Sequence, residues 1–222
     1  MSQTEKLPQL IDIWQQTLPW QPDEKQQQKF QLLYEEILAG NRQLNLTRIT
    51  TPMDFWEKHI WDSLAGLLGV EKEQFEQPLQ VIDIGTGAGF PGIPVAIAYS
   101  NWTITLLDGT RKKINFLQTL PPILQLDNLK TLTGRAEEIG RTKQHREAYD
   151  LALVRAVGTA SICAEYALPL LKNKGIAILY RGNWSKEEEI LLEKVGGEIE
   201  EIKSFHTPIT NSIRHCIYLR KR

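Results

Sequence analysis

The segment 81–97 constrains the fold of this chain more than any other stretch. It reads VIDIGTGAGFPGIPVAI and places Gly85, Gly87, Gly89 and Gly92 directly after an apolar run. Glycine permits sharp turns and lets a ligand lie against bare backbone. A helix that follows such a turn offers free N–H groups and the positive end of its dipole. The segment therefore predicts a strand, a turn that holds a ligand, and a helix.

Short apolar runs alternate with helical segments from residue 78 onward. The runs typical of buried parallel strands are 79–85, 103–109, 129–134, 150–157 and 175–182. The helical segments that separate or follow them are about 92–99, 111–120, 159–172 and 185–195. Two more strand-like runs, 198–206 and 215–222, have no convincing helix between them and predict an antiparallel hairpin at the sheet edge. Such alternation predicts an α/β fold with a mostly parallel, doubly wound sheet.

The beginning of the chain has the periodicity of helices instead. Apolar residues recur at helical spacing in 7–18 and in 30–38, and the second of these stretches ends before Gly40. A third helix is predicted to begin at Thr51, which would form a capping box with Asp54.

We therefore divide the 222 residues into a helical N-terminal cap, 1–77, and an α/β core, 78–222, packed as one compact unit. Apolar residues make up 41% and charged residues 24%, and the net charge of −1 gives no general sign of a nucleic-acid binder. Cys163 and Cys216 lie far apart without metal-ligand spacing, so we expect neither a disulfide nor a metal site. With no signal-like start and no apolar run of ~20 residues, we expect a cytoplasmic chain without a membrane span.

Two cofactor classes are compatible with the glycine loop. The stretch 87–92 has the G-x-G-x-x-G spacing of a dinucleotide site, which would indicate an NAD(P)-dependent oxidoreductase. In that interpretation the first glycine of the pattern comes two residues too late after the strand, and Gly85 has no role. S-adenosylmethionine instead requires a glycine directly after the strand, an acidic residue before it and a second acid for the ribose. Asp83, Gly85 and Asp108 meet these requirements, so we favour S-adenosylmethionine, with the nicotinamide cofactor and a turn without ligand as alternatives.

Six motifs occur together and in order. They are NLTRI (45–49), KHIWDS (58–63), DIGTGAGFPGIP (83–94), LLDGTRKKINFL (106–117), GRAEE (134–138) and VRAV (154–157). Over about residues 30–222 the chain resembles the bacterial 16S ribosomal RNA 7-methylguanosine methyltransferase family, also called the glucose-inhibited division protein B family. The resemblance implies a class I, Rossmann-like S-adenosylmethionine-dependent methyltransferase fold with a helical N-terminal extension. It further implies methyl transfer to the 7-position nitrogen of one guanine in the 530 loop of 16S rRNA, in the small ribosomal subunit or an assembly intermediate.

The resemblance assigns roles to particular residues. With Asp83 and Gly87 from the loop pattern, the expected donor contacts are Gly85, Phe90, Asp108, Gly109, Thr110, Ala136 and Glu137. Arg155 is expected beside both the donated methyl group and the target base. The candidates for RNA contact are Asn45, Thr47, His59, Asp62 and Arg181. For several of these a structural role stays open: a turn after a helix for the first two, and a bond between cap and core for His59 and Asp62.

The expected chemistry needs few catalytic groups. The guanine 7-nitrogen has a lone pair and no proton to lose, so alignment replaces a general base and can contribute roughly 7–11 kcal/mol. We expect Arg155, at the end of the run 150–157, to orient the base through guanine O6 or a phosphate.

Three features depart from the family's pattern. Lys58 stands where arginine is usual, and Arg181 stands where lysine is common, which affects expected RNA contacts. Pro121 and Pro122 interrupt a helical stretch, which should stop or kink near Thr119.

Other functions remain open at this point. A methyltransferase that acts on a small molecule or a protein would use the same donor site, and so would a binding module that only retains the donor. Basic side chains that could contact phosphates are Arg42, Arg48, Arg111, Lys112, Lys113, Arg135, Arg141, Arg220, Lys221 and Arg222, although such residues are usually only solvated. Trp184, which follows the run 175–182, is the tryptophan best placed to stack on a base.

Overall fold

The computed structural model describes residues 5–70 and 75–222. Within these residues one sheet contains β1 (Gln80–Ile84), β2 (Thr103–Asp108), β3 (Leu129–Thr133), β4 (Tyr149–Arg155), β5 (Leu171–Arg181), β6 (Gly197–His206) and β7 (Ile213–Lys221). The strand order is β3-β2-β1-β4-β5-β7-β6. Strands β1 to β5 pair in parallel, whereas β7 is antiparallel to both β5 and β6. The predicted α/β class, the doubly wound sheet and the antiparallel edge hairpin are confirmed.

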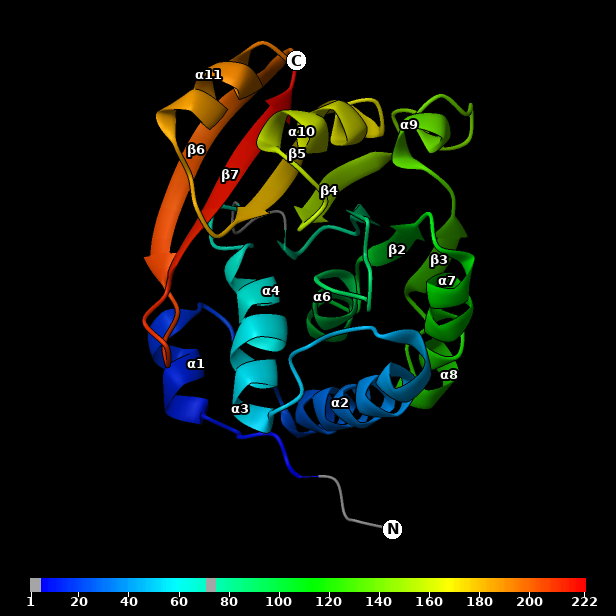
Figure 1. Cartoon of the computed structure of the whole chain (residues 1–222), viewed down its shortest axis with the longest axis vertical. Helices are drawn as coiled ribbons and strands as arrows, with labels where there is room; N and C mark the ends of the chain where they lie inside the picture. The colour runs from blue at the N-terminus through cyan, green and yellow to red at the C-terminus, as the bar shows by residue number, and fades with distance from the viewer. Residues whose placement is uncertain (1–4, 71–74) are drawn as a thin grey trace.

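Helices cover both faces of the sheet (Figure 1). One face carries α9 (Ala136–Ile139), α10 (Ala160–Ala167) and α11 (Lys186–Glu193). The opposite face carries α6 (Gly92–Ala98), α7 (Arg111–Leu117) and α8 (Leu120–Leu124), and α2 (Glu24–Leu44) lies beyond them. Because strand side chains alternate between faces, Val81 joins the core beneath α6 while Ile82 joins the core beneath α10.

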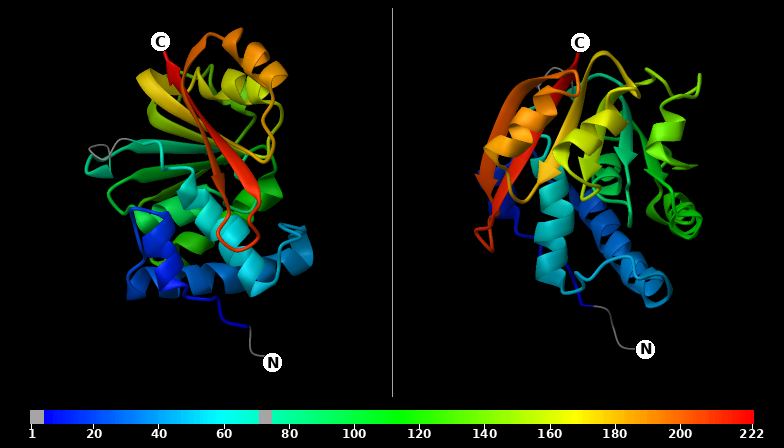
Figure 2. Two further views of the ribbon diagram at one scale, coloured as in Figure 1. Left: turned by 90° about the vertical axis from the view of Figure 1, so that its left-hand side faces the viewer. Right: turned by 45° about the horizontal axis from the view of Figure 1, so that its top comes forward.

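The N-terminal helices share the core of the sheet. They are α1 (Ile11–Thr17), α2, α3 (Pro52–Phe55), the π-helical segment η1 (Trp56–Trp61) and α4 (Asp62–Ala65). Trp14, Phe30 and Ile37 are buried in the same apolar cluster as Val95 and Leu117 of the α/β part. Figure 2 shows these blue to cyan helices gathered on one side of the sheet. The cap is thus packed on the sheet without an apolar core of its own.

The third helix begins at Pro52, close to the predicted start, and continues to Ala65 with a π-helical turn in its middle. π-Helical turns are rare and are frequent at functional sites. The predicted capping box is wrong: the Thr51 hydroxyl donates to the Asp54 carboxylate at 2.8 Å and caps no backbone N–H. Lys58 donates to the other oxygen of Asp54 at 2.6 Å, so this carboxylate serves two side chains.

Two helix ends differ from prediction. Helix α2 continues past Gly40 to Leu44. Gly40 does not end the helix but allows close packing, since a Cβ there would lie 2.5 Å from the ring of Phe116. Helix α10 ends at Ala167, before 172, because Pro169 cannot continue the helix and Leu171 already pairs with β4. The predicted break near Thr119 is confirmed, since α7 ends at Leu117 and α8 begins at Leu120.

The tip of the β6–β7 hairpin lies beside the N-terminal helices (Figure 1). It contacts Glu57 of η1. This carboxylate is 1% exposed and accepts the backbone N–H groups of Ile209 and Thr210 at 2.7 and 2.8 Å, and the Thr210 hydroxyl at 2.8 Å. Burial raises the pKa of Glu57, but the hydrogen bonds from Thr210 and Ile209 outweigh it and hold the pKa below its ordinary value. A buried carboxylate thus fixes the tip of the hairpin.

Two further findings concern the cysteines and the helices. Cys163 and Cys216 are buried free thiols. Among residues 5–70 and 75–222, no helix is both long and apolar enough to cross a bilayer.

Candidate functional site

The glycine turn after β1 opens onto a cavity. Gly85, Gly87 and Gly89 have φ angles of +68°, +60° and +95°, which favour glycine. At Gly87 an added Cβ would meet only a backbone oxygen, 3.9 Å away, whereas at Gly89 it would lie 2.3 Å from Ile93. Gly87 therefore faces open space, and Gly89 closes the turn against α6.

This glycine-loop cavity has a volume of about 380 Å³. Six of its lining residues are Gly85, Gly87, Phe90, Asp108, Gly109 and Arg155. A side lobe of about 80 Å³ shares Gly85, Asp108 and Gly109 and extends to Ala136 and Glu137. The cavity lies beyond the carboxyl ends of β1 and β4, where the strand order of an open α/β sheet reverses and ligands bind. Its volume lies in the usual range for small-molecule sites.

Asp108 ends β2 and is 8% exposed. One carboxylate oxygen accepts the backbone N–H of Gly87 at 3.0 Å, and the other accepts that of Thr110 at 2.7 Å. The carboxylate retains acceptor capacity toward the cavity, because an ionised carboxylate offers about four lone-pair sites. Thr110 itself is an exposed residue at the start of α7 and is outside the lining.

Asp83 lies beneath the loop, outside the lining of the cavity. The carboxylate is fully buried and accepts the Thr86 hydroxyl at 2.5 Å and the backbone N–H of Gly92 at 2.8 Å. Burial raises the pKa of Asp83 to about 6, against the opposing effect of these hydrogen bonds. The structure thus places this predicted donor contact where it joins the turn to α6.

Arg155 connects β4 to the helix of residues 52–65. Its guanidinium donates to the Lys58 carbonyl at 2.9 Å, to Asp62 Oδ2 at 3.1 Å and to His59 Nδ1 at 3.3 Å. It also lies over the Phe90 ring, 5.7 Å from the centroid. The predicted residues Arg155, His59, Asp62 and Phe90 therefore form one cluster.

His59 is a neutral link in this cluster. Its ring stacks on Phe90 with centroids 4.3 Å apart and planes 7° apart. Since arginine only donates, His59 Nδ1 is an acceptor, and Nε2 carries the proton that it shares with Thr47 Oγ1 at 2.8 Å. Burial, with the positive charges of Arg155 and Lys58, lowers the pKa of His59 to about 3. Both ring nitrogens are engaged, so His59 positions Arg155 and offers no free base.

Asn45 lies apart from the cluster, whereas Arg181 lines a cavity together with Asp62 and Arg155. Asn45 is an exposed residue with φ +49° at the end of α2, and it does not line the glycine-loop cavity. Asn41, which no sequence pattern marked, holds Thr47 through two hydrogen bonds of 2.8 and 2.9 Å. Arg181 pairs with Glu188 of α11 and donates to a backbone carbonyl, so much of its hydrogen-bonding capacity is used.

A second cavity, of about 330 Å³, adjoins the first one. We call it the hairpin cavity, because Phe205 and Arg214 of the β6–β7 hairpin line it together with Asp62. Arg155 and Ala156 line both cavities and form their common wall. Ala156 has a φ of +56°, an uncommon backbone conformation for a residue other than glycine.

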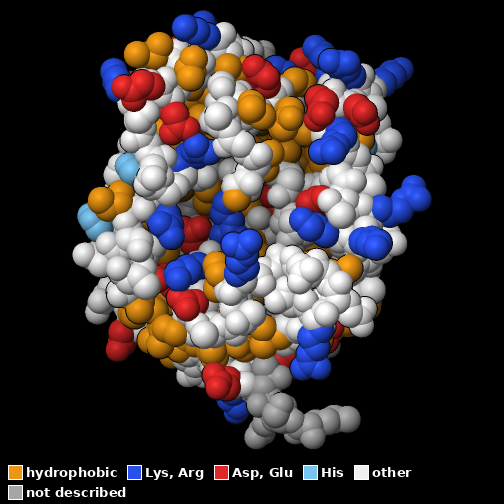
Figure 3. Space-filling view, in the orientation of Figure 1, with side chains coloured by type: hydrophobic (Ala, Val, Ile, Leu, Met, Phe, Trp, Pro, Cys, Tyr) orange, Lys and Arg blue, Asp and Glu red, His pale blue; other side chains and the backbone are white. Residues whose placement is uncertain are grey.

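Two residues in this region were missed by sequence reasoning. Arg214 Nε lies 3.5 Å from Asp62 Oδ1, so Asp62 faces two arginines, and Ala156 forms the wall between cavities. Arg214 has no sequence signal, because it is a single basic residue in the last strand. Ala156 lies in the VRAV motif, but the motif assigned a role only to Arg155. Lys113 and Arg135 line the glycine-loop cavity, and Lys and Arg side chains gather around the hollow on this face (Figure 3).

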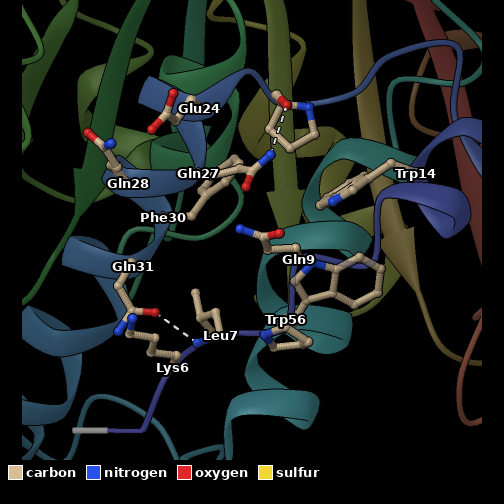
Figure 4. A pocket seen from close by; sticks show the side chains of 12 residues that line it. Lys6, Leu7, Gln9, Trp14, Glu24, Gln27, Gln28, Phe30, Gln31 and Trp56 are labelled. Atoms are coloured by element: carbon tan, nitrogen blue, oxygen red, sulfur yellow. Dashed lines mark hydrogen bonds between the residues drawn. The ribbon is translucent and has the colours of Figure 1, made fainter. Parts of the chain in front are cut away.

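A third cavity, of about 250 Å³, lies between residues 6–9 and α2 (Figure 4). Trp14, Phe30 and Trp56 contribute aromatic rings, and Gln9 and Gln28 contribute side-chain amides. None of the predicted site residues lines it. Within the described part of the chain, no group of three or more His, Cys, Asp or Glu side chains could hold a metal ion.

Solved structures with similar folds are methyltransferases. Fibrillarin of Aeropyrum pernix, solved with bound S-adenosyl-L-methionine, has a TM-score of 0.54 at 16% identity, covering 72% of this chain and 73% of that one. Precorrin-6y C5,15-methyltransferase of Geobacter metallireducens has a TM-score of 0.53 at 15% identity, covering 72% of this chain and 86% of that one. At such low identity these likenesses show the class I methyltransferase fold.

Sequence relatives give the family. Proteins called ribosomal RNA small subunit methyltransferase G from a Nostoc species and from Microcystis aeruginosa are 61% and 56% identical to this chain. The alignments cover 98% and 97% of this chain, and 91% and 99% of those proteins. The family described as rRNA small subunit methyltransferase G (GidB) matches residues 26–217. This chain therefore belongs to the rRNA small subunit methyltransferase G family.

Proposed function

We propose that this chain transfers a methyl group from S-adenosylmethionine to the 7-position nitrogen of a guanine in the 530 loop of 16S rRNA. The observation that carries the proposal is the position of Arg155. It ends β4 at the common wall of two cavities, one next to the glycine loop and one next to the hairpin. A donor and an acceptor that occupy adjoining cavities meet at this wall.

The glycine-loop cavity fits the donor. Gly87 leaves bare backbone toward the open space, and Asp108 has acceptor capacity for ribose hydroxyl groups. Gly85 and Gly109 would contact the same part of the donor, while Ala136 and Glu137 of the side lobe would contact its adenine. Phe90 offers an aromatic wall that His59 holds by stacking.

Few protein groups are needed for the chemistry. Bound S-adenosylmethionine supplies a methyl group on a sulfonium: the bond from guanine N7 to carbon forms as the carbon–sulfur bond breaks, leaving a neutral thioether and a positively charged 7-methylguanine. The base loses no proton, and the structure accordingly leaves His59 with both nitrogens engaged. Arg155 would orient the base by donating to guanine O6.

The rRNA would reach the cavities over a basic rim. Lys113 and Arg135 line the glycine-loop cavity, and Arg214 and Arg181 line the hairpin cavity. Such side chains neutralise phosphates and give binding that weakens with salt. The substrate would be 16S rRNA within the small subunit or an assembly intermediate.

The direct test uses labelled S-adenosylmethionine and small ribosomal subunits that lack 7-methylguanosine. Digestion and mass spectrometry should locate the label on a 7-methylguanosine of the 530 loop, and a parallel reaction with naked 16S rRNA identifies the preferred form of the substrate. Intact subunits and measurable donor binding without any labelled RNA would refute the proposal.

Arg155→Ala tests the role of the arginine. We expect donor affinity within a few-fold of wild type and the loss of most turnover. Arg141→Ala is the matched control, because Arg141 is exposed and lines neither cavity. Loss of donor affinity together with turnover, in a folded Arg155→Ala variant, would move Arg155 into the donor site.

A further inference from the structure

For a guanine bound at the common wall of the two cavities, the direction of N7 determines which edge of the base meets which residue. N7 and O6 lie together on one edge of the base, and N1–H and the 2-amino group point away from N7. If N7 faces the glycine-loop cavity, O6 lies at the common wall beside Arg155, and the other edge points into the hairpin cavity. In that orientation, a residue that lines only the hairpin cavity would meet the Watson–Crick edge.

Asp62 is the only acidic residue among the described residues that line the hairpin cavity, and it does not line the glycine-loop cavity. It is 7% exposed. Its two oxygens face Arg155 at 3.1 Å and Arg214 at 3.5 Å. A carboxylate has about four acceptor sites, so two further hydrogen bonds remain available to a ligand.

The donors of guanine match this arrangement. N1–H and the 2-amino group are two donors on one side of the ring, and two carboxylate oxygens accept both. O6 and N1 are neighbours on the base, as Arg155 and Asp62 are neighbours in the site, with 3.1 Å between Nη1 and Oδ2. Adenine has an acceptor at N1 and lacks the 2-amino group, so it would leave the carboxylate without partners. Bases taken out of a stacked strand are commonly read on this edge.

We propose that Asp62 selects the target guanine by accepting hydrogen bonds from its N1–H and 2-amino group in the hairpin cavity. This inference rests on the proposed function, because it takes a guanine as the acceptor. Phe205, which lines the same cavity and is held edge-on by Trp61 at 5.7 Å between centroids, offers an apolar ring beside the base.

The same contact strengthens during the reaction. Methylation at N7 gives the base a positive charge and makes its N1–H a stronger donor. A carboxylate at N1 is therefore bound more tightly in the transition state than in the ground state, and an interaction of that kind raises kcat. Asp62 thus contributes to selection and to rate through one pair of hydrogen bonds.

A binding experiment tests the inference without the reaction. Wild type, saturated with S-adenosylhomocysteine, is titrated with guanosine, inosine and adenosine 5′-monophosphates and followed by NMR. Inosine lacks only the 2-amino group. We expect guanosine monophosphate to bind about tenfold more tightly than inosine monophosphate, and adenosine monophosphate to bind most weakly.

Asp62→Asn keeps the shape of the side chain and removes one of the two acceptors. We expect this variant to bind the guanosine and inosine nucleotides with nearly equal, weaker affinity. Asp54→Asn is the matched control, since Asp54 pairs with Lys58 on the same helical run and lines neither cavity. Thermal unfolding and S-adenosylhomocysteine affinity show whether the Asp62→Asn variant is folded.

Arg214→Gln separates selection by Asp62 from a purely structural pairing. If Asp62 only held Arg214 in place, both variants would lose the preference for guanosine. We expect Arg214→Gln to keep the ratio between the two nucleotides even where both bind more weakly.

Methyl transfer gives the second readout. Small subunits reconstituted with inosine at the target position should be methylated about tenfold more slowly than those with guanosine by wild type, and at a similar rate by Asp62→Asn. Equal binding of guanosine and inosine nucleotides by wild type, or an unchanged preference in Asp62→Asn, would overturn the inference. Selective binding without any methyl transfer would refute the proposed function and leave Asp62 as a guanine-selective site.

Discussion

Glu57 provides a quantitative test of how the hairpin is fixed to the cap. In Glu57→Gln the amide oxygen can still accept the backbone N–H groups of Ile209 and Thr210, but both bonds lose their charge. A hydrogen bond to a charged group contributes about 1.5–3 kcal/mol, and a neutral one about 0.5–1.5 kcal/mol. With about 1 kcal/mol lost per bond, and a small cost where the new NH₂ group meets the Thr210 hydroxyl, we expect a loss of about 2 kcal/mol.

The pH dependence has a definite sign. Hydrogen bonds from Thr210 and Ile209 outweigh burial and hold the folded-state pKa of Glu57 below its ordinary value of 4.5. The charge of Glu57 therefore stabilises the folded state fully above that ordinary value, and this contribution is lost as the pH falls through the lower, folded-state pKa. The difference between wild type and Glu57→Gln should shrink in the same window, because the protonated carboxyl group resembles the amide.

The assay is urea unfolding of wild type and variant from pH 7 down to the lowest pH at which both are folded. Hydrogen exchange of the amides in residues 207–211 reports whether the hairpin tip opens before the rest. Glu198→Gln is the control, since Glu198 is an exposed glutamate of β6. A Glu57→Gln variant within about 0.5 kcal/mol of wild type at pH 7, or a difference that stays constant as the pH falls, would refute the reasoning.

Three further predictions concern packing, the glycine turn and the rim. Gly66→Ala places a Cβ 2.2 Å from the ring of Tyr180, so we expect a loss of about 1–3 kcal/mol in urea unfolding, and an unchanged midpoint would contradict this contact. Gly87→Ala and its control Gly196→Ala introduce a side chain at φ +60° and +100°, and each should lose about 1–2 kcal/mol of stability. Only Gly87→Ala should also weaken S-adenosylmethionine binding in calorimetry, by about tenfold, because its methyl group enters the cavity; equal affinities in the two variants would refute that placement. Lys113→Gln should reduce the slope of the logarithm of RNA affinity against that of salt concentration by about 0.7–0.9, whereas an unchanged slope would show that Lys113 meets no phosphate.

Much of the fold could be predicted, because its signals are local. Alternation of apolar runs and helical segments reports burial on both faces of a parallel sheet, and the runs at 79–85 and 103–109 became β1 and β2. The break before Pro121 follows from the geometry of proline alone. Gly40 was misleading because a glycine can either end a helix or allow close packing, and only the position of Phe116 decides between these two roles.

The site was predictable to the extent that it lies in contiguous motifs. Arg155, His59 and Phe90 belong to recognisable motifs, and the fold brings them together. The place of Asp83 could not be predicted, since spacing does not tell whether a carboxylate before a glycine faces the ligand or lies beneath the turn. Arg214 reaches the site through the antiparallel register of β7, which depends on the whole sheet.

The helical run 52–65 has a consequence for how this chain can vary in evolution and in the laboratory. Glu57 on this run fixes the hairpin, and His59 and Asp62 fix the arginine at the end of β4. The residues that would recognise the substrate therefore do not form a module that can be separated from the residues that would hold the donor. A chimaera that carries residues 78–222 on another N-terminal segment would lose the partners of Arg155 and of the hairpin together. If the proposed substrate contacts hold, exchanging substrate specificity between relatives would require that residues 52–65 and the last two strands be transferred together.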